Sequence, residues 1–97
     1  MAEKTLTIIA RSRAKAGREA DLVAAQRQLV IDTLKEEGCL RYELNVAKDL
    51  VGESLIVESW ASYDLWQAHI KGEAVAKYRA VAGELIESSV VTQWLPD

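Results

Sequence analysis

His69 is the only histidine of the chain, and it lies in a segment, residues 58–80, that is crowded with aromatic side chains. The ordinary pKa of an imidazole lies close to neutral pH, so His69 is the candidate for a general base. In that role it would remove the proton of a phenolic hydroxyl, and a positioned base typically contributes about 10²–10⁴-fold to a rate. The alternative is a structural histidine at the edge of the core, hydrogen-bonded to a backbone carbonyl.

Four aromatic side chains are candidates for lining a substrate pocket around this histidine. Trp60 and Trp66 would form walls for a flat aromatic molecule, because paired rings add about 0.5–1.5 kcal/mol to the burial of their area. Tyr42 and Tyr78 would orient a substrate oxygen through their hydroxyl groups. The competing interpretation for each is packing in a hydrophobic core. The indole N–H of Trp66 needs a hydrogen-bond partner, which a pocket beside its helix would supply.

Glu58 is a second candidate for acid–base chemistry. Strand alternation places it on the same side as Ile56 and Trp60, and apolar surroundings raise the pKa of a carboxyl group. Such a carboxyl group would act as a second acid or base. The alternative, which we prefer from the sequence, is an ion pair across the sheet with Arg11 or Arg13.

The elements that position these side chains follow from hydrophobic periodicity. Alternation and β-branched residues predict strands at residues 5–14, 39–49, 54–60 and 88–95. Helical spacing of apolar residues predicts helices at residues 17–38 and 62–86, the second interrupted at Gly72 and capped by Ser62. In the second strand, alternation puts four apolar side chains on one side: Leu40, Tyr42, Leu44 and Val46. The order strand, helix, strand, strand, helix, strand predicts a ferredoxin-like βαββαβ fold of the α+β class, in which a four-stranded antiparallel sheet carries its helices on one face.

The predicted sheet is apolar on both faces. The third strand directs Leu55 and Val57 to one side and Ile56 and Trp60 to the other, and residues 90–95 show the same property. A sheet with two apolar faces needs two covers, and a second copy of the same sheet is the simplest second cover. The sequence therefore predicts a homodimer that forms through the sheet face.

Composition narrows the remaining function classes. The length of 97 residues predicts a single domain over residues 1–97. Its net charge of −3, without a basic run, argues against nucleic acid, and no apolar run reaches the length of about 20 residues that crosses a bilayer. A single cysteine, Cys39, and the absence of a leader pattern favour the cytoplasm. Neither a metal-ligand spacing nor a glycine-rich phosphate loop is present, so the sequence implies no cofactor.

Three stretches occur in an order that resembles the antibiotic biosynthesis monooxygenase family: "IIARSRAKAGRE", "EEGCLRYEL" and "ESWASYDLWQAHIKGEAVAKY". The resemblance extends from about Leu6 to Leu95 and implies a small dimeric α+β barrel protein. The family includes cofactor-free monooxygenases of polycyclic phenols or quinols, haem-degrading enzymes and isomerases of small phosphorylated ligands.

The chain departs from the family pattern at two kinds of site. Ala74 and Val75 stand where the family often has a second histidine followed by phenylalanine. Where the haem-degrading branch has asparagine, tryptophan and histidine, this chain has Ala10, His69 and Arg79, which argues against haem degradation.

These observations lead to a hypothesis of a cofactor-independent monooxygenase that oxidises a hydroquinone or polycyclic phenol with dioxygen. His69 would be the base in a pocket between the helices and the sheet, lined by Trp66, Trp60, Tyr78, Tyr42 and Glu58. Two alternatives remain open at this point: a non-catalytic dimeric protein that binds a small hydrophobic molecule, and an isomerase or decarboxylase that uses the same histidine without oxygen.

Overall fold

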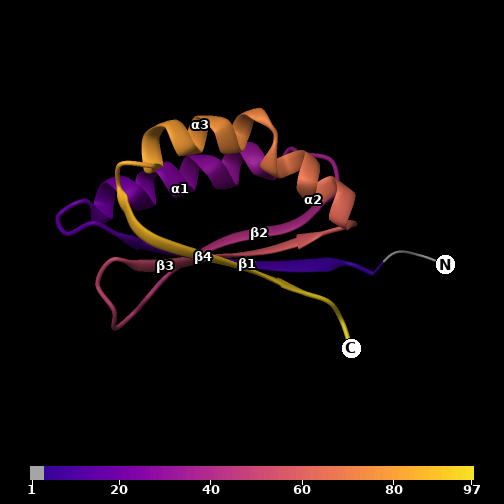
Figure 1. The fold of residues 1–97 in the computed structure, drawn as a ribbon, viewed down its shortest axis with the longest axis horizontal. Helices are drawn as coiled ribbons and strands as arrows, with labels where there is room; N and C mark the ends of the chain where they lie inside the picture. Colours follow the sequence, from indigo (N-terminus) through magenta and orange to yellow (C-terminus); the bar gives the residue numbers. More distant parts are fainter. Residues whose placement is uncertain (1–3) are drawn as a thin grey trace.

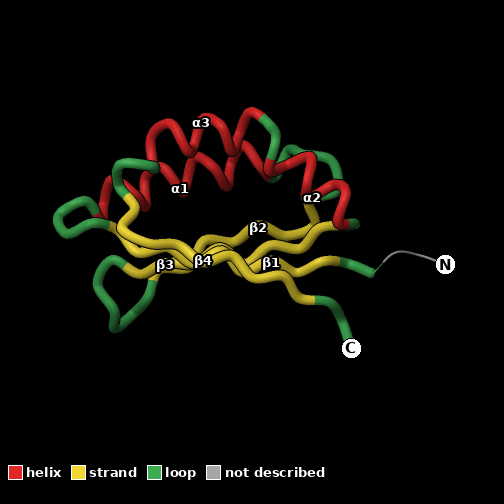
Figure 2. Tube along the Cα trace, in the orientation of Figure 1, coloured by secondary structure: helices red, strands yellow, loops and turns green. Residues whose placement is uncertain are grey.

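Strands and helices follow one another along the chain in the order that the sequence predicts, including the interruption of the second helix at Gly72. The computed structural model describes residues 4–97. Its elements are β1 (Leu6–Ala14), α1 (Glu19–Thr33), β2 (Cys39–Val46), β3 (Glu53–Trp60), α2 (Tyr63–Ile70), α3 (Glu73–Ala82) and β4 (Ile86–Trp94). The sheet is antiparallel in the order β2-β3-β1-β4, and all three helices lie on one of its faces (Figures 1 and 2). The predicted ferredoxin-like α+β fold is therefore confirmed.

The core lies between this sheet face and the helices. Along β3 every second residue is buried, beginning with Ser54 and ending with Trp60, while the residues between them are only half-buried. This period of two results from the pleat, which directs successive side chains to opposite faces. The main cluster of buried apolar residues consists of Leu6, Ile8, Leu29, Tyr42, Ile56, Trp60, Trp66 and Val75. In the described part of the chain, no helix is long and apolar enough to span a bilayer.

The start of β2 differs from the prediction. The pairing of β2 with β3 shifts register between Cys39 and Arg41, so an extra residue, Leu40, is accommodated there. As a result Leu40 is 59% exposed, and Cys39 packs against the core instead. A bulge of this kind interrupts the alternation that the sequence suggests. Val46, at the other end of the strand, is also exposed, so only Tyr42 and Leu44 of the four predicted residues contribute to the core.

The end of the second helical region also differs from the prediction. Ser62 caps α2 through its side chain as expected, with the N–H of Leu65 donating to its Oγ at 3.2 Å, and Gly72 separates α2 from α3. However, α3 ends at Ala82, before the predicted end at residue 86, and β4 already begins at Ile86. Leu85 is buried in the turn between them, in a small cluster with Ala14, Leu22 and Ala82. Leu85 therefore continues the helical spacing of buried residues beyond the end of α3, although it lies in a turn.

Gly38 occupies a position that requires glycine, and its replacement is expected to destabilise the protein. The φ angle of Gly38 is +83°, and a Cβ built there would lie 2.5 Å from Cδ1 of Leu65. We expect Gly38→Ala to lower the free energy of unfolding by about 2–4 kcal/mol, because the left-handed backbone and the overpacking each cost free energy. Urea unfolding monitored by circular dichroism measures this loss.

Gly17 provides the matched control for that substitution. Its φ angle is +84°, but a Cβ there meets no atom within 4 Å. Gly17→Ala therefore tests the backbone cost alone and is expected to lose less stability. Equal losses in the two variants would contradict the role assigned to the contact with Leu65.

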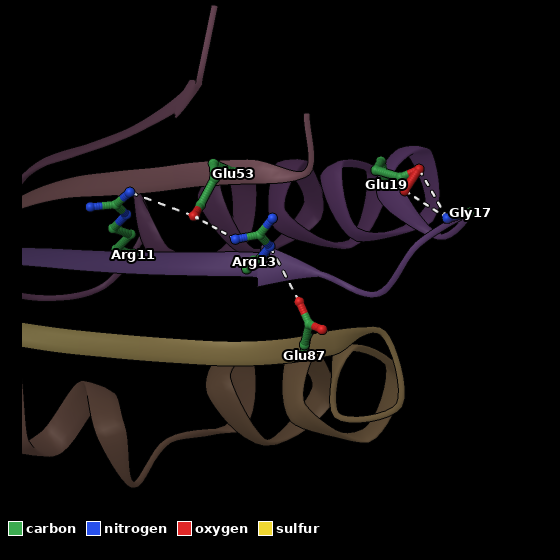
Figure 3. Close-up of polar contacts among 6 residues, drawn as sticks. All are labelled: Arg11, Arg13, Gly17, Glu19, Glu53 and Glu87. Carbon is green, nitrogen blue, oxygen red and sulfur yellow. Dashed lines mark hydrogen bonds and ion pairs between the residues drawn. The ribbon is translucent and has the colours of Figure 1, made fainter. Parts of the chain in front are cut away.

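The sheet face away from the helices mixes apolar side chains with ion pairs. Arg11 and Arg13 of β1 both lie near Glu53 of β3, at 3.5 and 3.8 Å, and Arg13 also pairs with Glu87 of β4 at 3.2 Å (Figure 3). The same face presents Val90 and Trp94, which lie opposite β1 residues Arg11 and Thr7 and are both exposed. Most residues of β4 are exposed on either face, so this edge strand is the least covered part of the sheet.

Candidate functional site

His69 is buried between two polar side chains that come from other elements. Its Nδ1 lies 2.9 Å from Oε1 of Glu36, in the segment after α1, and its Nε2 lies 3.4 Å from the hydroxyl of Tyr42 on β2. A carboxylate only accepts hydrogen bonds, so in the neutral ring Nδ1 carries the hydrogen and donates it to Glu36. Nε2 then keeps its lone pair and accepts the hydrogen bond that Tyr42 donates.

The surroundings of His69 keep the imidazole neutral. Burial lowers the pKa of His69 below its usual value, and the nearby carboxylate of Glu36 opposes this shift only in part. Burial also raises the pKa of Tyr42 far above its ordinary value, so its hydroxyl stays protonated. The arrangement is therefore a carboxylate that orients an imidazole, whose acceptor nitrogen on the far side of the ring faces the hydroxyl of Tyr42.

Aromatic rings fix the orientation of this imidazole. Trp60 stacks on His69 with ring centroids 4.7 Å apart and an angle of 30° between the planes. Tyr42 approaches the same imidazole edge-on, with a centroid distance of 5.4 Å. Trp60 is completely buried, so the stack belongs to the core and leaves little freedom for the histidine ring.

Glu58 lies on the helix side of the sheet, beside this group. It is buried, and its Oε1 accepts a hydrogen bond from Nε1 of Trp60 at 2.9 Å. Burial raises the pKa of Glu58 to about 7, although the hydrogen bond from Trp60 acts in the opposite direction. The predicted ion pair with Arg11 or Arg13 is wrong, because both arginines alternate onto the opposite sheet face and meet Glu53 there.

A groove between the helices reaches His69. Its volume is about 630 Å³, and it lies between the C-terminal end of α1 and the α2–α3 pair. Its lining residues are Asp32, Glu36, Glu37, Leu65, Ala68, His69, Gly72, Glu73, Ala74 and Lys77. The sequence placed the pocket between helices and sheet, but the space there around His69 is occupied by the packed rings of Trp60 and Tyr42.

The other predicted pocket residues lie outside this groove. Trp66 packs in the core and against Tyr63, and its buried indole Nε1 has no hydrogen-bond partner among residues 4–97. Tyr78 lines a separate small cavity of about 60 Å³ between α1 and α3. Of the six predicted site residues, the structure thus brings His69, Tyr42, Trp60 and Glu58 together and leaves Trp66 and Tyr78 apart from them.

Glu36 is the site residue that the sequence analysis missed. It lies 33 positions before His69, in the turn between α1 and β2, and its side chain is 27% exposed beside the groove. No spacing rule connects the two residues, because their contact depends on how α1 and α2 pack. The only available signal was the stretch "EEGCLRYEL", which contains Glu36 and supported the family resemblance.

Fold and site together define a small ferredoxin-like α+β protein with a buried histidine held by a carboxylate beside an open groove. The model of the antibiotic biosynthesis monooxygenase family matches residues 5–81 of this chain. The chain therefore belongs to the antibiotic biosynthesis monooxygenase family, and the resemblance seen in the sequence is confirmed. No curated protein matches the chain in sequence.

Several solved structures share the fold over nearly the whole chain. A protein from Shewanella oneidensis is 32% identical with a TM-score of 0.91, and the match covers 97% of this chain and 92% of that one. A protein from Mycobacterium tuberculosis is 28% identical with a TM-score of 0.88, covering 96% and 95%. A protein from Pseudomonas aeruginosa is 23% identical with a TM-score of 0.94, covering 100% and 98%, and this likeness concerns the fold alone.

Proposed function

We propose that this protein is a monooxygenase that oxidises a small phenol or hydroquinone with dioxygen, with His69 as the general base. The observation that carries the proposal is the imidazole held neutral beside the groove, with Glu36 on Nδ1 and only a long contact, 3.4 Å to the hydroxyl of Tyr42, on Nε2. A base of this kind is what a phenol needs before it can react with oxygen. Membership of the antibiotic biosynthesis monooxygenase family supports the same class of reaction.

In the proposed mechanism a substrate that enters from the groove displaces the hydroxyl of Tyr42, and the substrate hydroxyl takes its place at Nε2 of His69. The contact of Nε2 with the Tyr42 hydroxyl, at 3.4 Å, is longer than an ordinary hydrogen bond, so a substrate hydroxyl can compete for this lone pair. His69 removes the phenolic proton, and the carboxylate of Glu36 stabilises the imidazolium that forms. Tyr42, which stays protonated, then donates its hydrogen bond to the phenolate oxygen.

The substrate supplies all the electrons in this reaction. The phenolate of a hydroquinone passes electrons to dioxygen, one oxygen atom forms a new bond to ring carbon, and the other leaves as water. A hydroquinone and one dioxygen thus give one hydroxyquinone and one water, with four electrons transferred. The proton on His69 is returned to the oxygen that leaves.

Oxygen uptake tests the proposal directly. The purified protein is offered a panel of hydroquinones and anthrols, and labelled dioxygen is used to follow the oxygen atoms. We expect uptake that requires the protein, with one labelled atom in the product. Product formation without oxygen would indicate an isomerase or decarboxylase instead, and binding without any product would indicate a non-catalytic binding protein.

The proposed assembly is a homodimer that forms through the sheet face. The exposed Val90 and Trp94 and the half-buried Leu55 and Val57 support it, because a monomer would leave this apolar surface in water. On a sizing column we expect the protein to elute as a dimer of its 10.8 kDa chain. A stable monomer would contradict the proposal.

A matched pair of variants locates the interface. Trp94 on the sheet face is 57% exposed, and Val81 on α3 is 56% exposed. Trp94→Glu would bury an unpaired charge in a sheet-to-sheet dimer, and we expect it to weaken association at least about 100-fold, which corresponds to about 3 kcal/mol. Val81→Glu is expected to leave the dimer intact. Analytical ultracentrifugation measures both, and an equal effect of the two substitutions would place the interface elsewhere.

A further inference from the structure

The groove beside His69 is strongly acidic. Four of its lining residues carry carboxylates, namely Asp32, Glu36, Glu37 and Glu73, and Lys77 is the one cation among its lining residues. Lys77 lies 3.6 Å from Asp32, so its charge is already balanced. His69 does not balance the charge of the Glu36 carboxylate, because the imidazole is neutral. Within residues 4–97, Glu37 and Glu73 form no ion pair, so about three negative charges face the groove without a counterion.

The three helix ends at the groove do not reverse this sign. The C-terminal end of α2, where Ala68 and His69 line the groove, contributes partial negative charge. The C-terminal end of α1 contributes partial negative charge, and no basic residue lies in its last turn. The N-terminal end of α3 contributes partial positive charge, but Glu73 already occupies its first turn. The carboxylates therefore decide the potential in the groove.

The same groove also offers apolar surface. Leu65, Ala68 and Ala74 line it next to the imidazole of His69. A ligand with a small apolar body and a positive group would match both properties, whereas a carboxylated or phosphorylated ligand would be repelled. The volume of about 630 Å³ is sufficient for a single-ring compound with a side chain.

We infer that the groove selects an amine-bearing phenol or hydroquinone, whose ammonium group is held by Glu37 and Glu73 while its hydroxyl faces His69. This inference rests on the proposed function for the role of the hydroxyl. It adds the requirement that the substrate carry a positive charge, which membership of the family does not by itself imply. Two carboxylates attract the ammonium group and raise the local concentration of the ligand in the groove. Salt screens the charges, so this attraction is weaker at high ionic strength.

Binding of three phenols of similar size tests the inference. Tyramine, 4-propylphenol and 4-hydroxyphenylacetate differ mainly in the charge of the side chain, which is positive, neutral and negative. Isothermal titration calorimetry on the wild-type protein is expected to give affinities in that order, with at least about a tenfold span at low salt and a smaller span at about 1 M salt. Equal affinities, or binding by none of the three, would overturn the inference.

A pair of double variants controls for net charge. Glu37→Gln with Glu73→Gln is expected to reduce the preference for tyramine over 4-propylphenol at least fivefold. Asp49→Asn with Glu84→Gln removes the same charge from exposed positions that do not line the groove, and it is expected to keep the preference. An equal loss in both double variants would overturn the role of the groove carboxylates.

These measurements separate the inference from the proposed function. Binding is measured without turnover, so a preference for the amine supports the charge inference even if no oxygen is consumed, and that second result contradicts only the oxygenase. Oxygen uptake with neutral hydroquinones, together with equal binding of the three phenols, contradicts only the charge inference.

Discussion

Replacing His69 with alanine is expected to lower the rate of protein-dependent oxygen uptake by about 10²–10⁴-fold, the usual contribution of a general base. The substitution removes both the acceptor nitrogen at Nε2 and the group that Glu36 orients through Nδ1. Steady-state kinetics with the best substrate of the panel measures the loss. Near-ultraviolet circular dichroism verifies that the packing around Trp60 is retained. An unchanged rate would remove His69 from the mechanism while leaving the activity itself in place.

A companion variant at Glu36 distinguishes a positioning role from a purely structural one. The carboxylate of Glu36 raises the pKa of His69, against the larger lowering effect of burial. In Glu36→Gln this contribution is lost, so the pKa of His69 falls further. Because a base acts in its unprotonated form, the acid limb of the kcat/KM profile is expected to move to lower pH. A profile with a lower maximal kcat/KM and an acid limb at the same pH would indicate that Glu36 acts only in packing.

Replacing Glu58 with glutamine is expected to change how stability depends on pH. The pKa of Glu58 is about 7 in the folded protein, against an ordinary value of 4.5. Between these two values the folded state binds more protons than the unfolded state, so the free energy of unfolding falls as pH rises. Above pH 7 both states are ionised and this contribution no longer changes. The full difference is on the order of 3 kcal/mol, at 1.36 kcal/mol for each pH unit.

Glu58→Gln removes this titration but keeps an oxygen that can accept the hydrogen bond from Trp60. Relative to the wild type, the variant is therefore expected to gain about 3 kcal/mol of stability between pH 4.5 and pH 8. Urea titrations at several pH values measure this difference. His69, whose pKa is lowered, acts in the opposite direction below its ordinary pKa, but it is present in both proteins and cancels in the comparison.

Glu84→Gln is the control for that experiment, because Glu84 is exposed on the surface. It removes a carboxyl group without changing the core, and we expect the pH dependence of the wild type. If Glu58→Gln and the wild type differ by a constant amount at all pH values, then Glu58 does not titrate between pH 4.5 and pH 7.

The alternation and helical spacing of apolar residues were sufficient to predict much of the fold. Alternation along β3 placed Glu58 and Trp60 on the core side, and helical spacing placed His69 on the buried face of α2. The pattern failed at Leu40, because a bulge adds a residue without leaving a mark in the pattern. The pattern also gave a wrong end for the last helix, because Leu85 is buried at helical spacing although it lies in a turn.

The site was less predictable than the fold. The contact between Glu36 and His69 joins two elements whose relative position depends on packing over the whole helical layer. The groove is likewise formed by α1, α2 and α3 together, so no single segment of sequence encodes it. Aromatic residues near a histidine in sequence suggested a pocket, but Trp60 and Tyr42 are packed in the hydrophobic core.

Trp60 has consequences for how this protein can change over evolutionary time. Its N–H donates to Glu58, and its ring face supports His69, so one side chain serves two neighbours. A phenylalanine at this position would keep the support but leave a buried carboxyl group without its donor. Positions 58 and 60 are therefore expected to vary together among relatives: an apolar residue at 58 allows phenylalanine at 60, whereas a glutamate at 58 requires tryptophan.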